Sequence, residues 1–152
     1  MSIGTFDSLK PHNDIGFKLW QSCNRWQQIV TRALSPLNLT HVQYVLLAGV
    51  GHLSHTENNV TQYKLAQHTR TNIMMTSKVL RSLEGKNLLI RAKSKLDLRA
   101  KVLIMTQKGH KRLQEAQLVM TDIERLLFDK YDHESLNKWL DSMLTEGVVN
   151  DL

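Results

Sequence analysis

The apolar residues of this chain recur at helical spacing over most of its length. In the first such segment they are Ile15, Leu19, Trp26, Ile29, Val30 and Ala33. Asn13 or Asp14 is a suitable N-cap for this helix. Ser35-Pro36 is expected to end it, because the residue before a proline disfavours helical backbone. The pattern therefore predicts an amphipathic first helix.

A capping box predicts a second helix. Thr40 and Gln43 are three residues apart, so the hydroxyl and the amide can satisfy each other's backbone donors. Leu39 and Tyr44 flank the box at the positions of a hydrophobic staple. We expect the polar run 54–59, SHTENN, to stop this helix.

Two short helices joined by a tight turn come next, and this arrangement is a helix-turn-helix. Thr61 is the predicted N-cap of the first and Asn72 that of the second. The residues expected to face inward on the second helix are Ile73, Thr76, Val79, Leu80 and Leu83. Asn87 follows it and tolerates the left-handed conformation that ends many helices.

Residues 88–92 (LLIRA) and 101–105 (KVLIM) are β-type runs separated by a basic, polar turn. They predict a hairpin, and a hairpin directly after a helix-turn-helix is a wing. The predicted fold is therefore mainly α with a small β-hairpin wing.

Two more apolar helices are predicted after the wing. Thr106 caps a long one that continues to about Tyr131, and Asp132 or His133 opens the last one, which Gly147 ends. The last helix has an apolar face made of Leu136, Trp139, Leu140, Met143 and Leu144. The helix-turn-helix and its wing are too small to cover the apolar faces of all the terminal helices. We expect them to cover each other in a symmetric dimer.

The net charge of +6 is unevenly distributed. From Thr61 to Arg112 there are 13 lysines and arginines against two acids, which is a local net charge of +11, and the remainder carries −5. A protein that needed only solubility would mix its signs. The segregation indicates a segment that binds a polyanion. The alternative, a solvated basic face without a ligand, fits less well because the charges follow a recognisable order of elements.

Other classes of protein find little support in the sequence. No apolar run approaches the roughly 18 residues of a membrane span, and the N-terminus lacks the apolar region of a secretory signal. The single cysteine, Cys23, excludes an internal disulfide, so a cytoplasmic location is expected. Neither a Cys-His cluster nor an HExxH motif is present, and the seven histidines are interpreted as surface or helix-end residues. We predict no enzymatic activity, no metal and no cofactor.

Four segments in this order, LTHVQYVLLAGV, TQYKLAQHT, TSKVLRSLEGKNLLIR and DLRAKVLIMTQKGHKRL, resemble the MarR family of bacterial transcription regulators. The resemblance covers about residues 19–127. It implies a dimeric winged helix-turn-helix repressor or activator, often controlled by a small aromatic ligand or by oxidation. Asn87 departs from the usual glycine of the family, and Met74 and Met75 replace small hydroxylated residues.

On this basis the whole chain, residues 1–152, is interpreted as one MarR-like domain. Residues 1–35 and 107–152 would supply the dimerisation helices, and residues 40–106 the DNA-binding lobe. The expected partners are a double-stranded DNA operator and a second copy of the chain.

The resemblance also implies a role for Asp97 and Arg99, which match the Asp-x-Arg pattern of the family's wing. An arginine at a wing tip can insert into a narrow, electronegative minor groove. Asp97 could preset the direction of that guanidinium by accepting its hydrogen bonds. The alternative is an ordinary surface ion pair, worth about 0–1 kcal/mol.

Further DNA contacts are expected on three elements. On the recognition helix the outward residues are Met74, Met75, Ser77, Lys78 and Arg81. Lys78 could read guanine and a methionine could contact thymine methyl groups, although core packing is the alternative for the methionines. Phosphate contacts are expected at Gln62, Tyr63 and Lys64. Nonspecific charge would come from Arg91, Lys93, Lys95 and Lys101.

The aromatic residues Trp20, Trp26 and Tyr44 have two interpretations, which are packing in the core or dimer and the wall of an effector pocket. His41 would be a polar group of such a pocket. Cys23 is interpreted as an inert packing thiol. A peroxide-sensing branch of the family has a cysteine where this chain has Gly16.

The combined prediction is a sequence-specific, homodimeric DNA-binding regulator, a repressor released from a near-palindromic operator by a small aromatic effector. The rival interpretation is a winged helix that binds a protein and has no specific DNA site.

Overall fold

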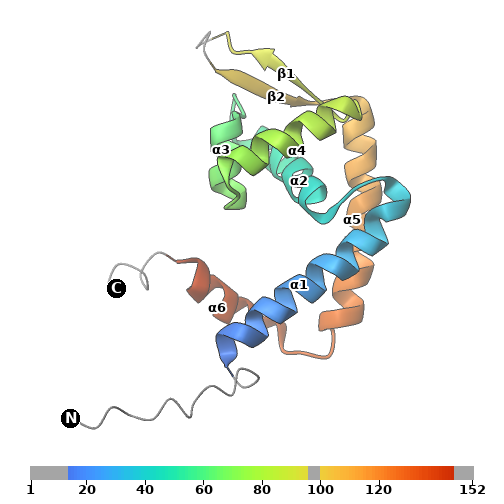
Figure 1. Cartoon of the computed structure of the whole chain (residues 1–152), viewed down its shortest axis with the longest axis vertical. Coiled ribbons are helices and arrows are strands. Elements are labelled where there is room, and N and C mark those ends of the chain that lie inside the picture. The colour runs from blue at the N-terminus through green and yellow to red at the C-terminus, as the bar shows by residue number, and fades with distance from the viewer. Residues whose placement is uncertain (1–13, 96–99, 146–152) are drawn as a thin grey trace, which may run out of the picture. The chain divides into compact units, whose positions relative to one another are not determined.

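The computed structural model describes residues 14–95 and 100–145 of the chain. The elements in order are α1 (Ile15–Leu34), the 3-10 turn η1 (Ser35–Leu37), α2 (His41–Thr56), α3 (Gln62–Thr69), α4 (Ile73–Gly85), β1 (Leu89–Lys93), β2 (Lys101–Met105), α5 (Gln107–Phe128) and α6 (His133–Leu144) (Figure 1). This confirms the predicted fold class, a mainly helical winged helix-turn-helix. Within the described ranges no helix has the length and apolar character needed to cross a membrane.

The helix starts are where the capping residues predict them. Gln43 N–H donates to the hydroxyl of Thr40 at 3.3 Å, and the side-chain oxygen of Gln43 accepts from Thr40 N–H at 3.1 Å, which completes the capping box. Side-chain oxygens also cap the first turns of α1, α3, α4 and α6, from Asp14, Thr61, Asn72 and Asp132 respectively. Short polar side chains therefore set these boundaries locally.

The end of α4 is equally well defined. Asn87 has a φ of 58°, the left-handed conformation expected of it. Leu88 N–H then donates to Leu83 C=O at 3.0 Å, and both leucine side chains are buried. The backbone bond and the burial of both leucines mark the end of the helix and the start of the wing.

Helix α2 ends at Thr56, within the polar run 54–59 that was expected to stop it. Two details differ from the sequence prediction. Ile73 is 43% exposed, so its predicted inward position is wrong. Ile73 is the first residue of α4, and this position at the end of the helix exposes its side chain although the helical spacing predicts an inward one. Helix α6 ends at Leu144, and Gly147 lies outside the described residues.

Helices α2, α3 and α4 pack together under the hairpin and form the winged lobe (Figure 1). Its fully buried side chains include Leu46, Leu47, Val50, Leu65, Leu80, Leu83 and Leu89. Gly49 allows α2 and α3 to approach closely, because a Cβ there would lie 2.8 Å from Leu65 Cδ1. These helices and the wing therefore share a buried apolar core.

The two wing strands are antiparallel, with Leu89 opposite Met105 and Lys93 opposite Lys101. The second strand is also attached to the segment that enters α3, since Leu103 N–H donates to Val60 C=O at 2.8 Å. The base of the wing is therefore fixed to the helix-turn-helix by backbone bonds.

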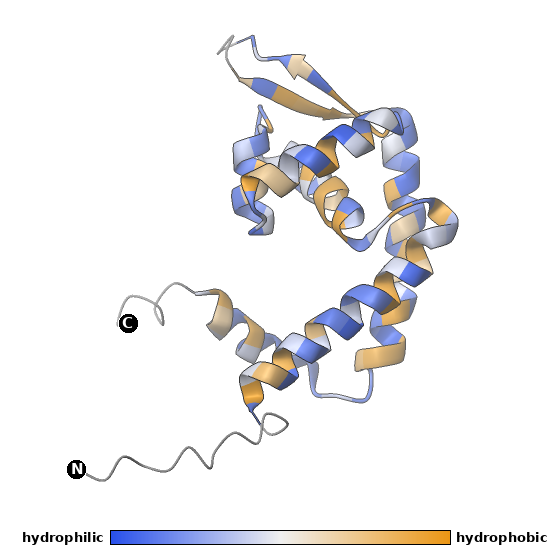
Figure 2. Ribbon diagram, viewed as in Figure 1, coloured by the Kyte–Doolittle hydropathy of each residue, from blue (hydrophilic) through white to orange (hydrophobic). Residues whose placement is uncertain are grey.

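The chain forms two compact units, residues 1–116 and residues 117–152. The first contains α1 and the winged lobe, and the second contains the end of α5 and α6. In α6, which is described along its whole length, no residue is buried. Figure 2 shows hydrophobic residues along this helix, and the exposed fractions are 43% for Trp139, 42% for Leu140 and 54% for Met143.

Candidate nucleic-acid interface

The first turn of α4 presents large apolar side chains to solvent. Met74 is 78% exposed and Met75 is 42% exposed, so the core-packing alternative does not apply to Met74. Asn72 accepts hydrogen bonds from the backbone N–H groups of both methionines, at 2.8 and 3.4 Å. Lys78 and Arg81 are exposed farther along the same helix, while Ser77 is half-buried. The helix thus combines an apolar tip with a cationic face.

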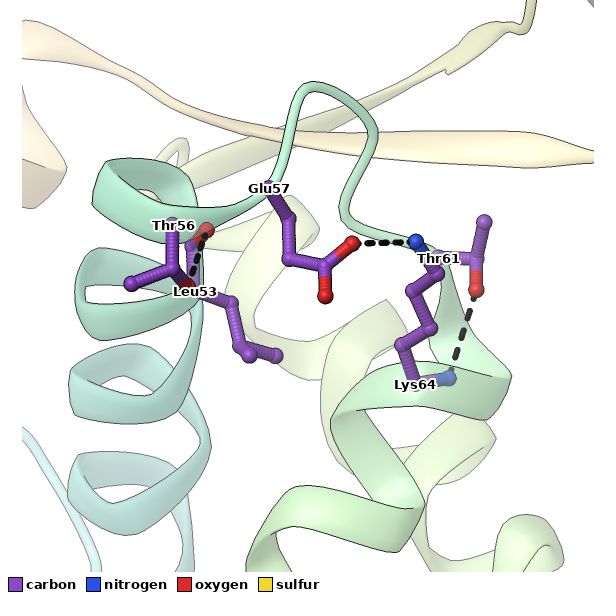
Figure 3. A network of polar contacts seen from close by, with 5 residues as sticks. All are labelled: Leu53, Thr56, Glu57, Thr61 and Lys64. Carbon is purple, nitrogen blue, oxygen red and sulfur yellow. Dashed lines mark hydrogen bonds and ion pairs between the residues drawn. The ribbon is translucent and has the colours of Figure 1, made fainter.

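At the start of α3, Lys64 is already engaged by a carboxylate. Figure 3 shows Lys64 paired with Glu57, which follows the end of α2, and both side chains remain partly exposed. Tyr63 is 65% exposed and its hydroxyl accepts from the Gln67 amide at 3.0 Å. Gln62 is half-buried. A phosphate at Lys64 would therefore have to compete with Glu57.

On the wing, Lys93, Lys95 and Lys101 are exposed, whereas Arg91 is only 18% exposed. The Arg91 guanidinium donates from both Nε and an Nη to Glu84 Oε2, at 2.9 and 2.6 Å. These hydrogen bonds and the positive charges of Arg91 and Lys101 hold the pKa of Glu84 below its ordinary value. Asp97 and Arg99 lie outside the described residues, so their wing-tip roles remain predictions.

A polar network that the sequence did not reveal joins the end of α4 to the turn before α2. Lys86 Nζ donates to Asn38 C=O at 2.7 Å and to Gln43 Oε1 at 2.9 Å. The Gln43 amide donates in turn to Ser82 Oγ at 3.0 Å. Burial, and secondarily the charge of Arg112, lower the pKa of Lys86. The only signal in the sequence was the capping box, which does not show that Gln43 has a second role.

The residues proposed for an effector pocket separate into two places. The rings of Trp26 and His41 meet edge to face, with centroids 6.0 Å apart. Burial lowers the pKa of His41, which favours the neutral imidazole. Tyr44 is half-buried on the same helix as His41. Trp20 instead stacks on Phe17 at 6.2 Å and is 65% exposed.

Two open hollows are present on the described surface. One, of about 450 Å³, lies along α1 around Trp20 and Arg25. The other, of about 470 Å³, lies on the winged lobe between the segment 57–60 and the wing, and it includes none of the predicted effector residues. The thiol of Cys23 on α1 is exposed in the single chain, so packing of this residue would require a partner molecule.

The histidines are not arranged as a metal site in the part of the chain that the structure describes. No group of three or more His, Cys, Asp or Glu side chains there could hold an ion. His52 stacks on His68, with ring centroids 5.0 Å apart.

Comparison with known proteins decides the family. The sequence profile described as MarR family matches residues 39–101. The HTH-type transcriptional regulator YdcH of Bacillus subtilis is 39% identical over 118 residues, which are 78% of this chain and 80% of YdcH. This chain belongs to the MarR family. Its members are transcriptional regulators rather than enzymes.

Solved structures of MarR-family proteins share the fold. A mutant of Escherichia coli MarR in complex with operator DNA has a TM-score of 0.76 at 19% identity, covering 86% of this chain and 93% of that one. CouR from Rhodococcus jostii RHA1, bound to p-coumaroyl-CoA, has a TM-score of 0.75 at 22% identity, covering 90% and 93%.

Proposed function

We propose that this MarR-family regulator is a homodimeric repressor that binds a near-palindromic operator in double-stranded DNA. Helix α4 would enter the major groove, with two such helices about one helical turn of DNA apart. The observation that carries the proposal is the exposed face of α4, where Met74, Lys78 and Arg81 project from a helix-turn-helix inside the basic segment. This face offers apolar contact to thymine methyl groups and cations to guanine or phosphate.

The remaining contacts are assigned by element. Gln62, Tyr63 and Lys64 at the start of α3 would bind phosphate, as would Ser77. Lys93, Lys95 and Lys101 would add charge from the wing. Asp97 and Arg99 would direct and insert the wing tip into the minor groove.

Dimerisation is proposed for residues 1–35 and 107–152, with residues 40–106 as the DNA-binding lobe of a single MarR-like domain. It is supported by the apolar face that α6 leaves exposed, including Trp139 and Met143. Large apolar side chains grouped on one exposed helix face are typical of an interaction surface. A second copy of the same helix supplies a matching surface in a two-fold dimer.

Release from DNA is proposed to follow binding of a small aromatic effector. The contact between Trp26 and the half-buried His41 is the most suitable part of the described structure, because it combines an aromatic face with a neutral polar ring. An effector acts only if it prefers a conformation that fits the operator poorly. Because the proposed partner is chromosomal DNA, the proposed location is the cytoplasm.

The test is selection of DNA sequences by the purified protein, followed by titration of the selected duplex and of a shuffled duplex. We expect specific binding that weakens steeply with salt. We also expect Arg99→Ala to lower operator affinity by at least about tenfold without changing the fold or the dimer. Lys18→Ala on α1 removes the same charge outside the basic segment and is the control, with its dimer checked by sedimentation equilibrium. Equal binding to both duplexes would favour the rival, a protein-interaction module.

A further inference from the structure

Among the described residues, one side-chain ion pair joins the recognition helix to the wing. Glu84 lies in the last turn of α4 and Arg91 is the third residue of β1. The guanidinium donates twice to the same carboxylate oxygen, at 2.9 Å from Nε and 2.6 Å from Nη. Two hydrogen bonds from a planar guanidinium fix orientation as well as distance.

The ion pair and the turn between α4 and β1 hold the wing at two different places. The backbone reverses at Asn87, and the bond from Leu88 to Leu83 fixes where the wing begins. The turn at Asn87 and the backbone bond between Leu103 and Val60 fix the base of the wing, and the angle between α4 and β1 depends further on how β1 is held along its length. The hydrogen bonds of Arg91, farther along β1, restrict that angle.

Strand β1 depends on the pair between Glu84 and Arg91 more than strand β2 does. Strand β2 is bonded to the backbone ahead of α3 through Leu103 and Val60. Strand β1 pairs with β2 along its length, and it is linked to α4 beyond the turn through the contact between Arg91 and Glu84. The pair therefore connects the two elements that must reach adjacent grooves of one duplex.

We propose that Glu84 and Arg91 are positioning residues for DNA binding: their ion pair sets the wing at the angle that lets it and α4 engage DNA together. This inference rests on the proposed function. Arg91 then acts through Glu84, and not as one of the nonspecific cations that contact phosphate.

The direction in which one substitution changes DNA affinity distinguishes a positioning role from a purely electrostatic effect. Glu84 is a negative charge on the element proposed to approach a polyanion. Without a positioning role, Glu84→Gln removes repulsion and raises affinity for DNA. With a positioning role, the same change releases Arg91 and the wing, and affinity falls despite the gain in net positive charge.

The experiment compares the wild-type chain with Glu84→Gln, Arg91→Gln and the exchanged pair Glu84→Arg/Arg91→Glu. Each is titrated with the selected operator at several salt concentrations. We expect both single variants to bind about tenfold more weakly, because the wing loses its preset direction. The exchanged pair has the wild-type net charge and should recover most of the affinity. The salt dependence of Arg91→Gln should match that of the wild type, because no phosphate contact is lost.

The matched control is Glu57→Gln, which removes the same charge from the ion pair with Lys64 and leaves the pair between Glu84 and Arg91 in place, so it should bind DNA equally or more tightly. Thermal unfolding of each variant checks that the lobe is folded. Tighter or equal binding by Glu84→Gln would overturn the proposal. So would failure of the exchanged pair to recover affinity, or a salt dependence lowered by about one phosphate contact in Arg91→Gln. Loss of specificity in the wild type itself would instead reject the proposed function.

Discussion

Leu46 of α2 and Leu140 of α6 are the same residue type on the apolar sides of two helices, yet the first is fully buried and the second is 42% exposed. Helix α2 buries Leu46, Leu47 and Val50 completely inside the winged lobe. Helix α6 has a clear amphipathic pattern but no buried residue anywhere along it. Amphipathicity therefore shows which face needs a partner, but not whether the same chain supplies it.

This contrast in burial distinguishes stability that comes from packing within one chain from stability that requires contact with another surface. The lobe buries its apolar side chains within the same chain, so the stabilisation that they give should not depend on protein concentration. The apolar face of α6 gains its stabilisation only when another surface covers it, so its contribution should depend on protein concentration if the proposed dimer forms. Three substitutions test this contrast, from the largest expected effect to the smallest.

Leu46→Ala should destabilise the folded chain by about 2–5 kcal/mol, because it leaves a cavity among side chains that cannot fully close around it. Urea unfolding followed by circular dichroism measures the change. Leu140→Ala, which removes the same atoms from an exposed site, is the comparison and should cost less at a concentration where the chain is monomeric. Equal losses at the two sites would contradict the contrast.

Leu140→Asp should weaken self-association by at least about thirtyfold, because it places a charge in the proposed dimer interface. Sedimentation equilibrium gives the dissociation constant, and the spectrum of the lobe should be unchanged. Asn137→Asp introduces the same charge at a position off the apolar face of α6 and is the control. A dimer that tolerates Leu140→Asp would place the interface elsewhere.

The smallest expected effect is on the pH dependence of stability and comes from substituting His41. It tests whether burial of this side chain contributes to the stability of the folded chain. Burial lowers its pKa in the folded state, so the unfolded chain binds the proton more readily. The folded state therefore has its full stability above the unfolded pKa of about 6.5 and loses some as the pH falls below that value. His41→Asn should flatten this loss between about pH 7 and 5 in urea unfolding. His55→Asn on the same helix, at an exposed position, is the matched control. An identical slope in wild type and His41→Asn would reject the assignment.

Most of the fold was accessible from local sequence features. Thr40, Thr61, Asn72 and Asp132 were predicted as helix caps and are so, because a cap is a bond between residues two or three apart. Asn87 adopts the left-handed backbone expected of it for the same reason. The family resemblance then identified which elements to expect at a DNA interface, although the individual DNA contacts stay predictions.

The partners of the charged side chains could not be predicted in the same way. The sequence determined the order of the elements, the density of positive charge and the amphipathic faces, all of which depend on spacing along the chain. Only the tertiary structure decided that Arg91 is bonded to Glu84 and that Lys64 is paired with Glu57. These outcomes depend on distances between elements, and a charge has no preferred partner until packing brings one within hydrogen-bonding distance.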